Sequence, residues 1–163
     1  MKSLVKTLFA ASAFSLVVSP IFAAELASRA ALTLEVAKRI SAAAEAEAMK
    51  NKWTVAIAIV DEGGHLVHLA KIDDTQYGSI DVAIQKAQTS AAFKRPTKVF
   101  EDAIAGGRTA IIGLKGALPL EGGVPIIHDG RVIGAVGVSG VKSVEDAQVA
   151  KAGVDALPGI LGK

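Results

Sequence analysis

The clearest pattern along the chain is an alternation between helical and extended spacing of apolar side chains. Between residues 33 and 48, apolar positions recur every three or four residues with charged positions between them, which predicts an amphipathic helix capped by Thr33. From Trp53 to Val60 large and small side chains alternate, which predicts a strand with one small-residue face that a helix can approach closely. Residues 61–64 supply a turn, and residues 65–71 complete an antiparallel hairpin.

The middle of the chain returns to helical spacing. Residues 80–91 predict a second helix with Ser79 as its cap, and this helix ends before Pro96 because a proline ring disfavours helical backbone in the preceding residue. Thr97 is expected to cap a shorter helix that ends near residue 105. Residues 108–117 show no clear periodicity.

A second hairpin and a last helix follow. Residues 124–128 and 131–139 predict two strands joined at Asp129 and Gly130, a dipeptide suited to a tight turn. Ser143 and Asp146 match a capping box, and the helix that follows is expected to end at Pro158. Hairpins rather than strand–helix–strand units favour an α+β fold, an antiparallel sheet covered by helices.

The N-terminal pattern is that of a secretory signal peptide. A short basic start is followed by an uncharged apolar run over residues 7–18, which is shorter than the roughly 20 residues needed to span a bilayer. Small residues around Ala23 offer a cleavage site after that residue, with Ala24 as the alternative. An uncleaved anchor or a buried helix is the other interpretation, and the break at Pro20 and the return of charge at Glu25 argue against it.

Cleavage divides the chain into a signal peptide, residues 1–23, and a single domain, residues 24–163, in the periplasm or outside the cell. Of the 18 basic residues, Lys2 and Lys6 lie in the signal, which leaves 16 basic residues against 16 acidic ones. The near-neutral domain gives no electrostatic support for nucleic-acid binding. No comparable apolar stretch follows, so stable membrane insertion is not expected, and the absence of cysteine excludes disulfides and thiol chemistry.

Three segments of the chain resemble one known family. They read GGVPIIHDGRVIGAVGVSG at residues 122–140, followed by Asp146, then KAQTSAAFKRPT at residues 86–97 and VDEGGHLVHLAKID at residues 60–73. Together they are similar to the GlcG/HbpS-like haem-binding domains, which also form the C-terminal half of PduO-type proteins. The resemblance extends over residues 32–156.

This resemblance implies a profilin-like α+β fold, a five-stranded antiparallel sheet covered by helices, and a tendency to form homo-oligomers. It also implies haem as the cofactor. Together with the signal peptide, it predicts an exported haem-binding protein that assists haem capture, sensing or degradation. The chain carries no nucleophile elbow and no HExxH motif, so the sequence favours a binding protein over an enzyme. Any activity would come from the iron of bound haem.

Three histidines are the first candidates to bind haem iron. His65 is preferred as the metal ligand because it leaves the glycine turn, where a ligand can approach. His68 lies three positions further along a strand, so the two side chains are expected to point to opposite faces and not to hold one ion together. His128, before the second turn, is expected to be exposed, and Tyr77 and Met49 are alternative ligands that could equally serve packing.

A second group of residues suits a carboxylate, such as a haem propionate. Lys86 and Thr89 share a helix face and Arg95 follows the helix end, so they could donate charge-assisted hydrogen bonds. Gly122 and Gly123, which lack a Cβ, would let a flat ligand or another subunit approach the backbone. Two alternatives to haem remain open, a module that binds an organic acid at Lys86, Thr89 and Arg95, and a purely structural oligomer.

Overall fold

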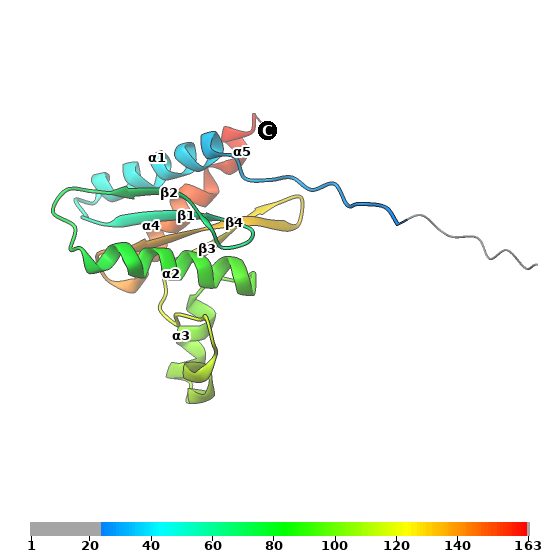
Figure 1. Ribbon diagram of the computed structural model, residues 1–163. Coiled ribbons are helices and arrows are strands. Elements are labelled where there is room, and N and C mark those ends of the chain that lie inside the picture. The colour runs from blue at the N-terminus through cyan, green and yellow to red at the C-terminus, as the bar shows by residue number, and fades with distance from the viewer. Residues whose placement is uncertain (1–23, 163) are drawn as a thin grey trace, which may run out of the picture.

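The computed structural model describes residues 24–162; the expected signal peptide at residues 1–23 lies outside the described residues. The chain folds into one sheet flanked by helices (Figure 1). The elements in chain order are α1 (Leu34–Lys50), β1 (Ala56–Asp61), β2 (Leu66–Lys71), α2 (Gly78–Phe93), α3 (Lys98–Ala105), the 3₁₀ helix η1 (Thr109–Gly113), β3 (Gly123–His128), β4 (Arg131–Ser139), α4 (Ser143–Asp155) and α5 (Leu157–Ile160).

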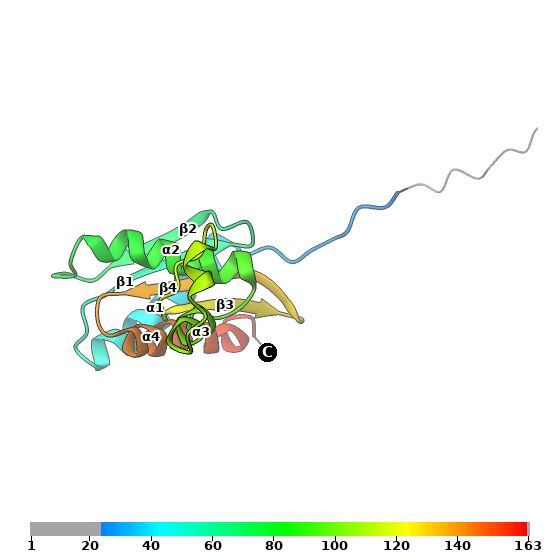
Figure 2. The ribbon, with the colours of Figure 1, turned by 90° about the horizontal axis from the view of Figure 1, so that it is seen from below.

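The sheet is antiparallel throughout, with strand order β2-β1-β4-β3. Figure 2 looks onto the face that α2 covers, and α1 and α4 pack on the opposite face (Figures 1 and 2). The fold is therefore α+β, as the hairpins predicted. The described residues form four strands and not the five implied by the resemblance. Residues 94–122 form a lobe that contains α3 and η1 and extends away from the sheet.

The side chains of β1 divide between the two faces as predicted. Ile57 and Ile59 join the large apolar core under α1 and α4, while Ala56 and Ala58 pack against Ala83 of α2. The small-residue face is thus the one that α2 approaches. All six residues of β1 pair with β4, so the faces of β1 also determine which face of β4 meets each helical layer.

Helix caps were predicted less well. Thr33 does cap α1, accepting a hydrogen bond from the N–H of Val36. The predicted box of Ser143 and Asp146 is wrong, because α4 has Lys142 as its N-cap and Glu145 accepts the N–H of that residue. Glu145 is therefore the acidic residue of the capping box, and Asp146 is buried instead.

The other predicted helix ends also move by a few residues. The second helix begins at Gly78, so Ser79 lies inside its first turn and is buried beside Ser139 instead of capping. Thr97 occupies the N-cap position of α3, but its hydroxyl accepts the N–H of Gly123. The helix begun at Ser143 ends at Asp155, and the expected stop at Pro158 lies within the short α5.

Paired glycines bring α2 into direct contact with the sheet. Gly123 of β3 and Gly137 of β4 lie opposite each other in the register. A Cβ at Gly137 would lie 2.0 Å from the carbonyl oxygen of Ala83, and one at Gly123 would lie 2.3 Å from that of Lys86. These contacts are too short for any side chain, so the backbone of α2 rests on the backbone of the strands. Close helix–sheet packing is therefore the role of Gly137.

A buried ion pair joins the helices on the two faces of the sheet. Lys86 of α2 and Asp146 of α4 are each 2% exposed, and the Nζ atom of Lys86 donates to Oδ2 of Asp146 at 2.8 Å and to the carbonyl oxygen of Val138 at 3.0 Å. The other carboxylate oxygen, Oδ1, accepts the N–H of Val141. Burial raises the pKa of Asp146, while the hydrogen bond and charge of Lys86 act to lower it. All the polar atoms of the pair are thus satisfied inside the protein.

We predict that Gly137→Ala lowers the free energy of unfolding by about 3 kcal/mol, because the added methyl group must push α2 off the sheet. Gly78→Ala is the matched control within α2, since a Cβ there meets no atom within 4 Å. Urea unfolding of both variants measures the difference. Equal stability of the two variants would show that α2 is not seated as described.

We predict that Lys86→Met lowers the free energy of unfolding by about 3–5 kcal/mol, because it leaves the Asp146 carboxylate buried without its partner. The double variant Lys86→Met/Asp146→Leu should recover at least half of this loss. Lys98→Gln, which removes an exposed ion pair with Asp102, is the control and should change stability little. Denaturant unfolding tests the series, and a Lys86→Met variant as stable as Lys98→Gln would contradict it.

Candidate functional site

The turns of the two hairpins and the C-terminal end of α2 border an open cavity of about 800 Å³, which we call the hairpin cavity. The turn after β1 and the turn before β4 meet at one end of the sheet because β1 and β4 run antiparallel, with Asp61 paired to Gly134. Part of the extended segment before α1, residues 28–30, closes one side. The cavity has the size of a small-molecule or cofactor site.

The lining of the hairpin cavity is mixed. Aliphatic side chains come from the end of α2 and from the β3–β4 hairpin, namely Ala91, Ile127, Val132 and Ile133. The cationic side chains are Arg29, Lys94 and Arg131, and the carboxylates are Glu62 and Asp129. Such a lining can contact an apolar ring system while placing positive charge at its polar edge.

His128 lines this cavity. Its side chain is 21% exposed, so the expectation that it would be solvent exposed is wrong. The Nε2 atom lies 3.3 Å from Oδ2 of Asp129. Asp129 and Gly130 both have positive φ, at 47° and 74°, which is the tight turn predicted for this dipeptide.

His65 lies at the edge of the hairpin cavity. Its ring packs against Gly63, which lines the cavity, and its Nδ1 atom lies 3.4 Å from Oδ1 of Asp61. Burial acts to raise the pKa of Asp61, but the N–H groups of His65 and Gly63 donate to the carboxylate and lower it overall. The ionised carboxylate holds the Nδ1 side of the ring and leaves Nε2 for a ligand. The side chain is 83% exposed and thus accessible.

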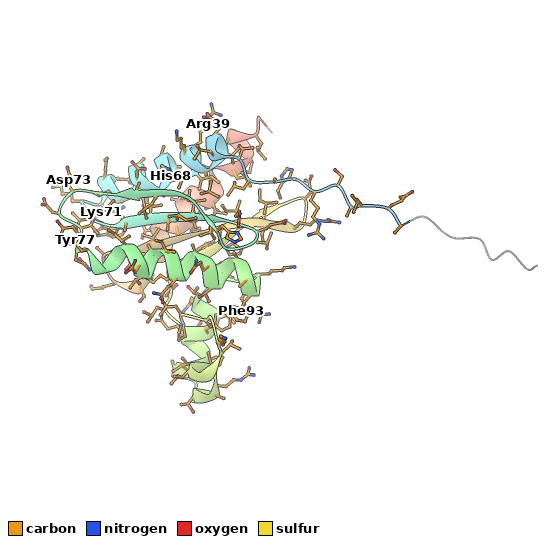
Figure 3. The ribbon with its side chains drawn as sticks, in the orientation of Figure 1. Arg39, His68, Lys71, Asp73, Tyr77 and Phe93 are labelled. Atoms are coloured by element: carbon orange, nitrogen blue, oxygen red, sulfur yellow. The ribbon has the colours of Figure 1, made fainter. Side chains whose placement is uncertain are left out.

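The remaining candidate iron ligands lie elsewhere. His68, half-buried on β2, pairs with Ile59, whose side chain faces the core under α1 and α4 (Figure 3). Tyr77 is exposed at the end of the sheet opposite the hairpin turns, with Nζ of Lys71 5.8 Å from its ring centroid (Figure 3). Met49 is exposed on α1. No group of three or more His, Asp or Glu side chains among residues 24–162 is arranged to hold a metal ion.

The expected carboxylate group is dispersed by the structure. Lys86 is committed to Asp146, and the hydroxyl of Thr89 donates to the carbonyl of Gln85 and accepts the N–H of Leu118. Arg95 lies apart from both, exposed at the base of the lobe, with its Nε donating to the carbonyl of Phe93. The three residues form no common accessible site.

Gly122 and Gly123 are likewise occupied from within the chain. A Cβ at Gly122 would lie 2.8 Å from Nζ of Lys86, and one at Gly123 would meet the backbone of Lys86 and the methyl group of Thr97. The close approach expected at these glycines is therefore made by α2 and not left open for a ligand.

A second, smaller cavity lies in the lobe formed by α3 and η1. We call it the lobe cavity; its volume is about 290 Å³. Its walls include Arg95 and Arg108. Arg108 belongs to the segment whose pattern was uninformative, so sequence reasoning missed it.

Among the described residues, no helix has the length and apolar character needed to cross a membrane.

The comparisons with known proteins agree with one another. A family model described as "Haem degrading protein HbpS-like" matches residues 32–155. The protein GlcG of Escherichia coli is 44% identical over 108 residues, which cover 66% of this chain and 81% of GlcG.

Two solved structures extend the similarity to the fold. A double mutant of HbpS from Streptomyces reticuli matches with a TM-score of 0.75 and 31% identity over 86% of this chain and 97% of that chain. The structure of a PduOC:heme complex matches with a TM-score of 0.70 and 25% identity over 78% of this chain and 95% of that chain. Since the family model covers well over half of the sequence, the chain belongs to the HbpS-like family.

Proposed function

We propose that this chain is an exported haem-binding protein that holds haem at the hairpin cavity. The observation that carries the proposal is a cavity of about 800 Å³ at one end of the sheet, lined by His128 and three cationic side chains, with His65 at its edge beside Gly63. Membership of the HbpS-like family and the similarity to a haem complex of PduOC support the choice of ligand. Capture and storage outside the cytoplasm follow from the same proposal.

The residues of the cavity fit haem in chemistry as well as in size. Aliphatic side chains such as Ile127 and Ile133 can pack on the porphyrin faces, and Lys94 and Arg131 can pair with the propionates through charge-assisted hydrogen bonds. We assign iron ligation to Nε2 of His65, because Asp61 holds the opposite side of its ring. His128, whose Nε2 faces Asp129, is assigned a polar contact within the cavity.

Bound haem would supply iron chemistry with oxygen or peroxide. The protein would contribute binding and orientation: the carboxylate of Asp61 lies 3.4 Å from Nδ1 of His65, and aliphatic side chains form part of the cavity lining.

Titration of the domain with hemin tests the assignment. Wild type should give the shifted Soret band of histidine-ligated haem, and His65→Gln should lose that spectrum and weaken binding by about tenfold or more, because the iron loses its nitrogen ligand. His68→Gln is the matched control and should titrate like wild type, since His68 lies outside the cavity.

Two results would overturn these assignments. Absence of any Soret shift in the wild type would exclude haem as the ligand. A wild-type spectrum in His65→Gln together with its loss in His128→Gln would move the ligand to His128.

Export rests on the N-terminal pattern of residues 1–23. In the producing cell, N-terminal sequencing of the accumulated protein should give Ala24 as the first residue, or Glu25 if cleavage follows Ala24. Recovery of the chain with Met1 or Lys2 at its N-terminus would contradict export.

Self-association, which the family resemblance implies, stays a prediction. The lobe carries exposed apolar side chains outside its cavity that another subunit could cover, including Ile112 and Leu120. Sedimentation velocity of the domain measures the state directly.

A further inference from the structure

The lobe cavity is separate from the proposed haem site. Residues 94–122 follow α2, form α3 and η1, and lead into β3. This lobe projects away from the sheet, and the lobe cavity lies in it (Figure 1). Phe93, at the end of α2, marks where the lobe begins (Figure 3). The two cavities share no lining residue.

The body of the lobe cavity is aromatic and aliphatic. Phe93 and Phe100 pack edge to face, with ring centroids 5.2 Å apart and an interplanar angle of 69°. Ile111 and Leu114, from η1 and the residue after it, complete the wall. This surface suits a small apolar group, and the volume of about 290 Å³ falls at the lower end of small-ligand sites.

Two arginines line the cavity beside this apolar surface. Arg95 precedes α3 and Arg108 follows it, and both line the cavity. The chain reverses after α3 at Gly107, which has a φ of 91°, and the N–H of Arg108 donates to the carbonyl of Ala103 at 2.8 Å. The guanidinium of Arg95 lies 6.0 Å from the centroid of the Phe100 ring. The fold of the lobe thus brings both cations to one cavity.

The nearby carboxylates are engaged elsewhere. Glu101 accepts the N–H of Glu121, and Asp102 pairs with Nζ of Lys98 at 2.8 Å. No acidic residue lines the lobe cavity, and within residues 24–162 no carboxylate forms an ion pair with Arg95 or Arg108. The positive charge of the cavity is therefore uncompensated by the protein.

We propose that the lobe cavity binds a small organic carboxylate with an apolar body, its carboxylate between Arg95 and Arg108 and its apolar group on Phe93 and Phe100. Planar guanidinium groups match the geometry of a carboxylate, and the aromatic wall selects an apolar anion over an inorganic one. The lining of this cavity holds no His, Tyr, Met or Cys that could bind iron, so it is distinct from a haem site. The function goes beyond haem binding.

Calorimetric titration of the whole domain with benzoate and with its neutral counterpart benzamide tests the proposal. Benzoate should bind at least tenfold more tightly than benzamide, because only the anion pairs with the guanidinium groups. Arg95→Gln and Arg108→Gln should each weaken benzoate binding by about tenfold. Arg39→Gln, which removes an exposed arginine of α1, is the control and should bind benzoate like wild type.

Three outcomes would overturn the proposal. They are no benzoate binding at millimolar concentration, equal binding of benzamide, and unchanged benzoate binding in the variant that lacks both arginines. A hemin titration of that double variant separates the two sites: an unchanged Soret shift supports an independent carboxylate site, and its loss would make the two arginines part of the haem site.

Discussion

The ion pair between Lys86 and Asp146 ties together the two helical layers of this protein. It runs past the start of β3, where Gly122 leaves room for the ammonium group, and joins α2 on one face of the sheet to α4 on the other. Breaking either half would leave a buried charge, which costs far more than the loss of an exposed pair. The contact of α2 with Gly123 and Gly137 requires the same position of α2 on the sheet.

The position of α2 on the sheet also determines where both cavities lie. A helix held against the strand backbones ends in a fixed place, so Lys94 reaches the hairpin cavity while Phe93 and Arg95 reach the lobe cavity. Lys94 adopts the left-handed conformation, with a φ of 54°, where the chain turns out of α2. The residues after the helix are thereby divided between two sites of different chemistry: one combines histidine with cations and the other combines arginine with aromatic rings.

The sequence supported prediction of local elements better than of long-range partners. Alternation in β1 identified its small-residue face, and Asp129 with Gly130 identified the second turn, because both depend on backbone properties of neighbouring residues. The sequence pattern placed Lys86 at a ligand site. Its actual partner, Asp146, lies 60 residues away in the chain, and no periodicity links the two residues. Arg108 was missed since its position depends on how the lobe folds. The hairpin cavity depends on the antiparallel pairing of β1 with β4, which no pattern in the sequence predicts.

We propose that haem binds at the end of the sheet where the two hairpin turns meet. The most direct test is NMR mapping with gallium protoporphyrin, a diamagnetic substitute for haem. Backbone amide signals of residues 62–65 and 127–133 should shift, and those of the lobe, residues 98–114, should stay unchanged. Shifts confined to the lobe, or centred on His68, would contradict it.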